Sequence, residues 1–257
     1  MNNVYVADFE NNRICKITSD GTLSVLAESG KWDNTDDSNI AIARFDRSIG
    51  LVVSKKGNLY VSDTYRHRIC RITLDGVMSI LAGSGKYGFQ DGSGSEAQFR
   101  CPAGLAVDSE ESIYVADTHN QRIRKITSDG IVTAIAGDVP GGHRDGIGVD
   151  AKFAEPKDVA IDEKGNLYVA DALNHSIRKI SRGVVSTLAG SRDHERGYVN
   201  DFGAAAQFNY PTGVAVDSAG NVYVVDYLND RIRKITPEGL VRTLVGSTKG
   251  CNPPIYD

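Results

Sequence analysis

The sequence has 257 residues, 40% of them apolar and 24% charged, which is typical of a globular protein with a sizeable core. Its net charge of −4 at pH 7 argues against a nucleic-acid-binding protein that depends on a basic surface, and it contains no run of 18 apolar residues that would predict a membrane span. The four cysteines are too few and too unevenly spaced to predict a disulfide framework or a zinc site. The first residues show no signal-peptide pattern, and a strand pattern begins at Val4, so we expect a trimmed or incomplete chain whose compartment is undetermined.

Five copies of one segment run through the chain from end to end. They begin at Asn3, Asn58, Ser112, Asn166 and Asn221 and read NVYVADFENNRICKI, NLYVSDTYRHRICRI, SIYVADTHNQRIRKI, NLYVADALNHSIRKI and NVYVVDYLNDRIRKI. The shared Asp falls at Asp8, Asp63, Asp117, Asp171 and Asp226, so successive copies are 54 or 55 residues apart. Such a period predicts a repeat architecture, and because no linker separates the copies we expect a single domain over residues 1–257.

Each full copy contains four apolar runs of strand length, which in the last copy are residues 212–217, 221–226, 231–236 and 240–246. Val, Ile, Tyr and Thr dominate the runs, turn-forming residues separate them, and no window of ten residues has the apolar period of a helix. Several runs lack alternation between apolar and polar residues, which favours sheets that are covered on both faces. The sequence therefore predicts an all-β chain of four-stranded antiparallel blades, which is a β-propeller.

The last copy also carries a Pro followed by Gly-Val-Ala-Val-Asp, then Gly-Asn-Val-Tyr-Val and Asp-x-x-Asn-x-Arg-Ile. This pattern resembles the NHL-repeat family of β-propellers over essentially the whole chain. The resemblance implies the fold more strongly than the function, since that family includes protein-binding, RNA-binding, sensor and lyase members. Two features depart from it: the first copy lacks its innermost strand, and five copies stand where six blades are common. We therefore expect either five blades that close, with Cys251–Asp257 beside Val4–Asp8, or a truncated six-bladed propeller.

The repeated polar residues are predicted to be scaffold, because a catalytic site is one place whereas these residues recur in every blade. The repeated Asp suits a turn that it stabilises by accepting backbone N–H groups, and the turn Asn suits a left-handed position (Asn11, Asn120, Asn174 and Asn229). Four arginines are predicted to pair with these Asp residues or to pack between blades (Arg13, Arg68, Arg122 and Arg231). The five histidines form no close-spaced pair (His67, His119, His143, His175 and His194), so the sequence predicts no metal, cofactor or catalytic set.

Residues that break the repeat are better candidates for a binding site. They lie at what we call the loop face, the end of each blade that carries the long connections between blades and the hairpin turn after each repeated Asp. The candidates are Trp32, Arg66, Tyr87, Lys157, Asp158 and Tyr198. Aromatic and basic residues are typical of interface hot spots, and loops tolerate such variation. We predict a scaffold that binds a protein, a peptide or a small ligand, and not a nucleic acid; the alternative is a metal-dependent propeller enzyme of lyase or lactonase type.

Overall fold

The computed structural model describes residues 3–8, 10–28, 49–191, 193 and 195–246. Within these residues the chain forms β-strands, turns and 3-10 helices of one turn, as the strand-length apolar runs predict. Contacts divide the chain into two compact units, which are Met1–Ile113 with Lys125–Thr133 and Tyr114–Arg124 with Ala134–Asp257. The single domain over residues 1–257 stays a prediction.

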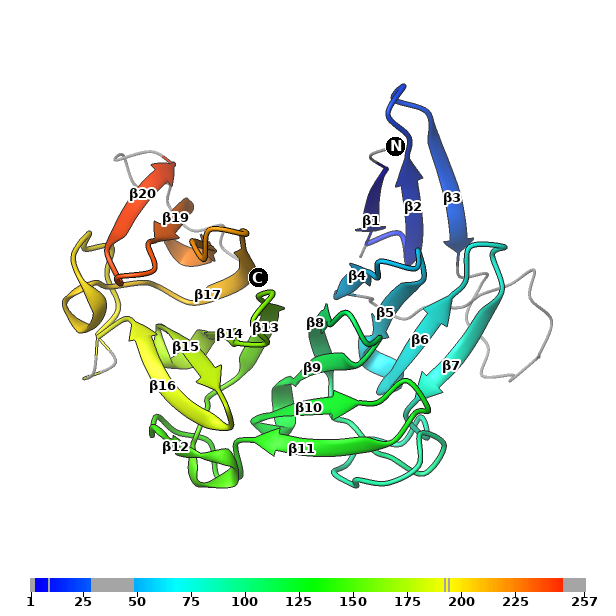
Figure 1. The fold of residues 1–257 in the computed structure, drawn as a ribbon, viewed down its shortest axis with the longest axis horizontal. Helices are drawn as coiled ribbons and strands as arrows, with labels where there is room; N and C mark the ends of the chain where they lie inside the picture. The colour runs from blue at the N-terminus through cyan, green and yellow to red at the C-terminus, as the bar shows by residue number, and fades with distance from the viewer. Residues whose placement is uncertain (1–2, 9, 29–48, 192, 194, 247–257) are drawn as a thin grey trace, which may run out of the picture. The chain divides into compact units, whose positions relative to one another are not determined.

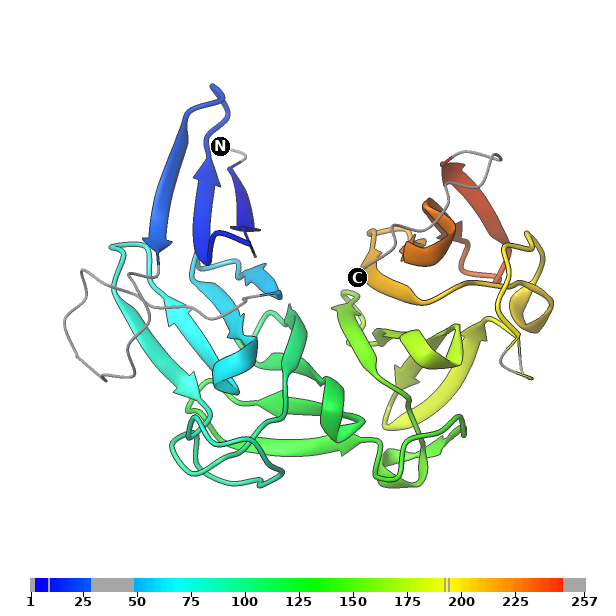
Figure 2. The same ribbon diagram turned by 180° about the vertical axis from the view of Figure 1, so that it is seen from behind.

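Each copy of the repeat forms one small antiparallel sheet, or blade, whose strands follow one another in chain order (Figure 1; seen from behind in Figure 2). The first blade contains β1 (Val4–Asp8), β2 (Arg13–Ile17) and β3 (Leu23–Glu28), and the second contains β4 (Leu51–Val53), β5 (Leu59–Asp63), β6 (Arg68–Ile72) and β7 (Met78–Ala82). The third contains β8 (Pro102–Val107), β9 (Ile113–Asp117), β10 (Arg122–Ile126) and β11 (Val132–Ala136). The fourth contains β13 (Pro156–Ile161), β14 (Leu167–Asp171), β15 (Ser176–Ser181) and β16 (Val184–Ala189), with β12 (Gly146–Ile147) added beside β16. The fifth contains β17 (Pro211–Val216), β18 (Val222–Asp226), β19 (Arg231–Ile235) and β20 (Val241–Val245).

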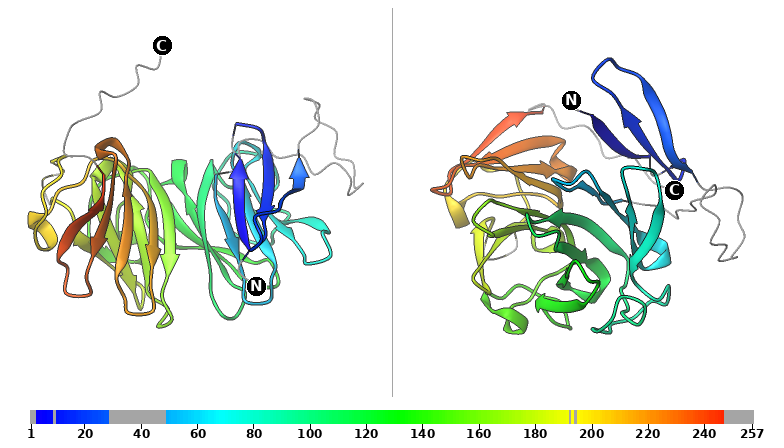
Figure 3. Two further views of the ribbon diagram at one scale, coloured as in Figure 1. Left: turned by 90° about the horizontal axis from the view of Figure 1, so that it is seen from above. Right: turned by 45° about the vertical axis from the view of Figure 1, so that its right-hand side comes forward.

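The predicted fold is confirmed: the chain is a β-propeller of five antiparallel blades. The second to fifth blades each contain the four predicted strands, and Figure 3 shows the strands of the fifth blade side by side in orange and red. Among the described residues the first blade has three strands, which correspond to the second, third and fourth strands of the other blades, as predicted. The predicted contact of Cys251–Asp257 with Val4–Asp8 involves residues outside the described part of the chain.

A 3-10 turn follows the repeated Asp in the second to fifth blades, and its geometry corrects one expectation. These turns are η1 (Thr64–Arg66), η2 (Thr118–Asn120), η4 (Ala172–Asn174) and η6 (Tyr227–Asn229). The residue in the left-handed conformation is not the turn Asn but the one after it, such as His175 after Asn174. The reason is that the Asn174 side-chain amide donates to Asp171 at 2.8 Å, which places Asn174 inside the turn and leaves the reversal to His175.

The repeated Asp pairs with different arginines in different blades. In the first two blades the predicted partners hold, with Arg13 Nε 2.7 Å from Asp8 and Arg68 Nε 2.9 Å from Asp63. In the last three blades the Asp contacts a fully buried arginine two residues further along the strand, in the pairs Asp117–Arg124, Asp171–Arg178 and Asp226–Arg233. In the first two blades the position of this buried arginine is occupied by Cys15 and Cys70. A buried thiol and a buried guanidinium therefore fill the same place in different blades.

Neighbouring blades pack through apolar side chains. We call the side of a blade that faces the preceding blade its leading face and the side that faces the following blade its trailing face. The trailing face of the fourth blade meets the leading face of the fifth in one cluster (Tyr168, Ala170, Ile177 and Ala189 with Phe208, Val214, Val222, Val224, Ile235 and Val241). The first and second blades meet in the same way (Tyr5, Ala7, Ile14 and Ala27 with Leu59, Val61, Cys70, Ile72 and Met78).

Candidate functional site

The residue before the first Pro of an inner strand is held in a strained conformation at the loop face. Three such residues have positive φ, namely Cys101 at 50°, Glu155 at 51° and Tyr210 at 53°. In each case the backbone N–H donates to a side chain from the preceding blade, which is His67 Nδ1 at 3.2 Å, Gln121 Oε1 at 2.6 Å and His175 Nδ1 at 3.0 Å, respectively. The three accepting residues are themselves left-handed. We call this hydrogen bond, with the left-handed residue that donates it, the loop-face clasp. The clasp recurs in three blades, whereas the side chain of the donating residue differs from blade to blade.

In the fourth and fifth blades this clasp brings three polar side chains together. The Tyr210 hydroxyl donates to Glu155 Oε2 at 2.9 Å, and Lys157 Nζ lies 3.1 Å from the same oxygen and 5.9 Å from the centre of the Tyr210 ring. Burial alone would raise the pKa of Glu155, but the hydrogen bonds from Tyr210 and Lys157 outweigh it and hold that pKa below its ordinary value. Burial, followed by the hydrogen bond to Glu155, raises the pKa of Tyr210. At neutral pH the cluster therefore holds a carboxylate and a neutral phenol.

A β-bulge explains how Lys157 reaches this cluster. The pairing of β13 with β14 skips Lys157, because Pro156 is opposite Asp171 whereas Asp158 is opposite Ala170. A bulged residue leaves the ladder and its side chain is re-aimed, here toward Glu155. The pairing of β17 with β18 skips a residue at the equivalent place, between Pro211 and Gly213.

Asp158 lies next to the bulge and joins two inner strands. Its Oδ2 accepts the backbone N–H of Val214 on β17 at 2.9 Å, and its Oδ1 accepts that of Val159 at 2.9 Å. Burial raises the pKa of Asp158 to about 7, although both N–H groups favour the ionised carboxylate. Asp158 therefore titrates near neutrality at a contact between the fourth and fifth blades.

The structure adds exposed turn residues that the sequence did not single out. The second residue after the repeated Asp is exposed on every 3-10 turn, and it is Tyr65, His119, Leu173 or Leu228. The N–H of Leu173 donates to Ala154 O and that of Leu228 to Asn209 O, both at 3.1 Å, so each turn lies over the residue that precedes Glu155 or Tyr210. The sequence signal was a variable position between the constant Asp and a residue that is Asn in every copy except the second, where it is Arg66.

The predicted site residues fall into two sets. Arg66 lies in η1 and Tyr87 packs edge-on against His67, with ring centres 6.1 Å apart, within the first unit. Lys157 and Asp158 share strand β13 in the second unit, and the exposed Tyr198 ring lies 4.6 Å from the Arg231 guanidinium carbon. Trp32 lies outside the described residues.

The histidines of the described residues serve the scaffold at three positions. His67 and His175 accept backbone N–H groups, and His143 Nε2 lies 3.1 Å from the Thr187 hydroxyl. Across the described ranges no three His, Cys, Asp or Glu side chains converge as a metal site would require. The same part of the chain contains no helix long and apolar enough to cross a membrane.

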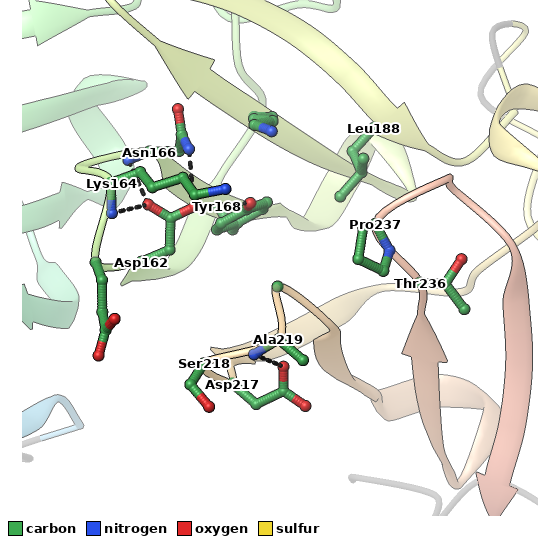
Figure 4. A pocket seen from close by; sticks show the side chains of 13 residues that line it. Asp162, Lys164, Asn166, Tyr168, Leu188, Asp217, Ser218, Ala219, Thr236 and Pro237 are labelled. Atoms are coloured by element: carbon green, nitrogen blue, oxygen red, sulfur yellow. Dashed lines mark hydrogen bonds between the residues drawn. The ribbon is translucent and has the colours of Figure 1, made fainter.

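A pocket of about 210 Å³ lies between hairpin turns of the fourth and fifth blades (Figure 4). These turns are at the end of the blades away from the loop face, which we call the opposite face. Asp162 and Asp217 line it, together with Lys164, Leu188 and Pro237. Asp162 and Asp217 each accept hydrogen bonds from an Asn and a Tyr of their own hairpin. Because the same hydrogen bonds occur within both hairpins, these carboxylates hold the turns in place and are not evidence of a single site.

Comparison with known proteins agrees with the repeat structure. The NHL repeat model matches residues 45–72, 99–126 and 153–180, and the teneurin NHL domain model matches residues 199–253. NHL repeat-containing protein 2 of Bos taurus is 30% identical over 278 residues, which cover 93% of this chain and 38% of that protein. The chain thus spans well under half the length of this relative.

Two solved enzymes share the fold. Virginiamycin B lyase from Staphylococcus aureus superposes with a TM-score of 0.58 at 17% identity, covering 94% of this chain and 66% of the enzyme. A gluconolactonase from Xanthomonas campestris superposes with a TM-score of 0.65 at 16% identity, covering 96% of this chain and 73% of the enzyme. At this level of identity the likeness extends to the fold alone.

Proposed function

We propose, because the chain belongs to the NHL-repeat β-propeller family, that it is a binding module which engages a protein or peptide partner through its loop face. Protein binding is general for the family. The loop-face clasp is the observation that carries the proposal. Strained backbone is maintained only where the surrounding structure over-determines it, and such positions cluster at functional sites.

In the clasp the backbone is constant and the side chain varies, as a recognition surface requires. Its backbone conformation and the hydrogen bond that its N–H donates to the preceding blade recur in three blades, whereas the side chain that it presents is Cys101, Glu155 or Tyr210. A scaffold position would repeat its side chain as well, as the buried Asp does. Variable side chains on a fixed backbone allow a partner to be recognised without cost to the sheets.

The contact residues of this proposal are those that break the repeat. They are Trp32, Arg66, Tyr87, Lys157, Asp158 and Tyr198, joined by Glu155 and Tyr210 from the clasp. The ion pair of Lys157 with Glu155 next to Tyr210, and the exposed rings of Tyr87 and Tyr198, suit a protein or peptide with matching polar and apolar groups. The negative net charge does not favour a nucleic acid.

The test compares the two faces of the blades. The tagged chain is used to capture partners from an extract of its source organism, next to loop-face variants (Tyr87→Ala, Lys157→Ala and Tyr198→Ala) and matched opposite-face variants (Lys55→Ala, Lys56→Ala and Lys164→Ala). We expect a partner captured by the wild type to be lost with the loop-face set and kept with the opposite-face set. Loss with only the opposite-face set would overturn the proposal. The substitutions at the exposed positions should change the free energy of unfolding by about 0.5 kcal/mol or less, because such positions carry little stability. Lys157→Ala also removes the half-buried ion pair with Glu155 and should cost up to about 1 kcal/mol.

A further inference from the structure

At the loop face between the second and third blades, three positions are basic that are neutral or acidic between the later blades. Arg66 occupies the place of the turn asparagine (Asn120 and Asn174). Lys86 lies two residues before the glycine whose N–H donates to the carbonyl of the repeated Phe, and later copies have Pro140 and Glu195 there. Arg100 follows the repeated Phe directly, where later copies have Ala154 and Asn209. These positions thus carry three positive charges here, none between the third and fourth blades, and one negative charge between the fourth and fifth.

The three basic residues come from separate segments that meet around His67. Arg66 immediately precedes His67 at the end of η1. The N–H of the residue after Arg100 donates to His67 Nδ1 at 3.2 Å. The ring of Tyr87, the residue after Lys86, packs edge-on against the His67 ring, with ring centres 6.1 Å apart. All five residues belong to the first unit, so the fold of that unit alone brings the three cations together.

The described carboxylates of this region are paired or lie further out along the blades. Asp63 is fully buried and pairs with Arg68 at 2.9 Å. Asp91 and Glu96 belong to the outer part of the loop, which pairs with β11 and with the residue after β7. The described surface around His67 is therefore positively charged.

Exposed aromatic rings border these cations. Tyr65, Tyr87 and Phe89 are 47%, 73% and 44% exposed. The later blades do not repeat this set of three rings at the matching positions, which are His119, Gly141 and His143, and then Leu173, Arg196 and Tyr198. We call the three cations with these three rings the basic junction. It combines positive charge with exposed apolar surface, the combination that a charged peptide with an apolar anchor requires.

We propose that the basic junction binds an acidic peptide segment in which an aromatic or aliphatic side chain lies beside the carboxylates. This inference rests on the proposed function and specifies the chemistry of its partner. The carboxylates pair with Lys86 and with the guanidinium groups of Arg66 and Arg100, which are suited to donate two parallel hydrogen bonds to one carboxylate. The apolar side chain packs against Tyr87 and Phe89. A peptide fits better than RNA, because a chain with a net charge of −4 gains little from a continuous phosphate backbone.

The test uses a displayed library of random dodecapeptides, selected on the purified 257-residue chain. The test variant combines Arg66→Asn, Lys86→Glu and Arg100→Asn. It gives this junction the residues that the fourth and fifth blades already hold at the same positions, so it should fold, as far-UV circular dichroism will show. The matched control makes the same change of charge at the opposite face, with Lys55→Glu, Lys56→Asn and Lys164→Asn.

Selection on the wild type should enrich peptides that contain Asp or Glu next to Trp, Tyr, Phe or Leu. In fluorescence polarisation these peptides should bind the test variant about tenfold more weakly, because three exposed ion pairs contribute roughly two- to threefold each. The control should bind them like the wild type. Their affinity for the wild type should also fall as NaCl rises from about 50 to about 300 mM, because salt screens exposed charges.

Other outcomes would overturn the inference and separate it from the proposed function. Enriched peptides without acidic residues, or acidic peptides that bind the test variant as well as the wild type, would show that the basic junction is not their site. If such peptides are lost with Tyr198→Ala, which lies outside the junction, the loop face still binds peptides and the proposed function stands. If no enriched peptide responds to any loop-face variant, or none is enriched, both fail. A single-stranded RNA oligonucleotide that binds more tightly than the peptides, and only without the three substitutions, would assign the junction to nucleic acid instead.

Discussion

Two departures from the repeat at the opposite face compensate for each other, and this can be measured. In the fourth blade Asp162 Oδ2 accepts hydrogen bonds from Asn166 at 2.8 Å and from the Tyr168 hydroxyl at 3.2 Å. In the second blade the position of Asp162 is occupied by Ser54. The equivalent Asn58 and Tyr60 instead donate to Glu111 Oε2 from the third blade, at 3.3 and 2.8 Å.

Glu111 occupies a position that other blades give to glycine. It has a φ of 66°, and Gly57, Gly165 and Gly220 have positive φ at the equivalent places. A non-glycine residue in this region costs roughly 1–2 kcal/mol. The hydrogen bond of the buried Tyr60 hydroxyl to a carboxylate is worth roughly 1.5–3 kcal/mol. Glu111→Gly removes the backbone strain at this position and also removes the acceptor of the Tyr60 hydroxyl. We therefore expect a net loss of about 1 kcal/mol in the free energy of unfolding.

Ser54→Asp alone should also destabilise the chain, because it places a second carboxylate beside Glu111 around one hydroxyl. Together the two substitutions give the second blade an Asp in the turn that already contains Gly57, and give the third blade a glycine at its left-handed position, so that both turns match that of the fourth blade. The double variant should therefore be at least as stable as the wild type. The assay is urea unfolding of all four chains followed by circular dichroism, analysed as a double-mutant cycle. Additive losses would refute the reasoning, since they would show that Ser54 and Glu111 are independent.

Three further predictions follow from single groups. Arg178→Ala should cost about 3–5 kcal/mol in thermal or urea unfolding, because it leaves the buried Asp171 carboxylate without its ion pair; a loss below 1 kcal/mol would contradict this. The raised pKa of Asp158, about 7, means that the folded chain holds this proton more tightly than the unfolded chain. The stability of the wild type relative to Asp158→Asn should therefore fall as pH rises from about 4 to about 7, and parallel pH profiles of the urea midpoint would disprove it. Burial raises the pKa of the Cys70 thiol to about 12, so an alkylating reagent at pH 8 should label Cys70 only after unfolding, as mass spectrometry would show; labelling of the native chain would count against it.

The sequence alone determined the strands and the blades, because their signals are local. Apolar runs such as residues 221–226 are bounded by turn residues, and the same order recurs five times, so the spacing of the repeated Asp sets the period of the fold. The role of the Asp as scaffold was also readable, since repetition itself distinguishes a structural residue from a catalytic one. The separation between constant positions and variable loop-face residues needed no coordinates either.

Only the tertiary structure decided which partners these residues take. Arg231 and Arg233 lie two apart on one strand and therefore share a side of the sheet, so the sequence could not tell which one is buried against Asp226. The contact of Tyr60 with Glu111 joins residues of different blades, and the clasp of His175 on Tyr210 does the same. Lys157 contacts Glu155 because of a β-bulge that the local sequence pattern does not predict. The contacts of Tyr60 and Tyr210 join segments more than 30 residues apart along the chain, and the choice between Arg231 and Arg233 and the bulge at Lys157 depend on how strands pair and pack, whereas strand and turn preferences are set within a few residues.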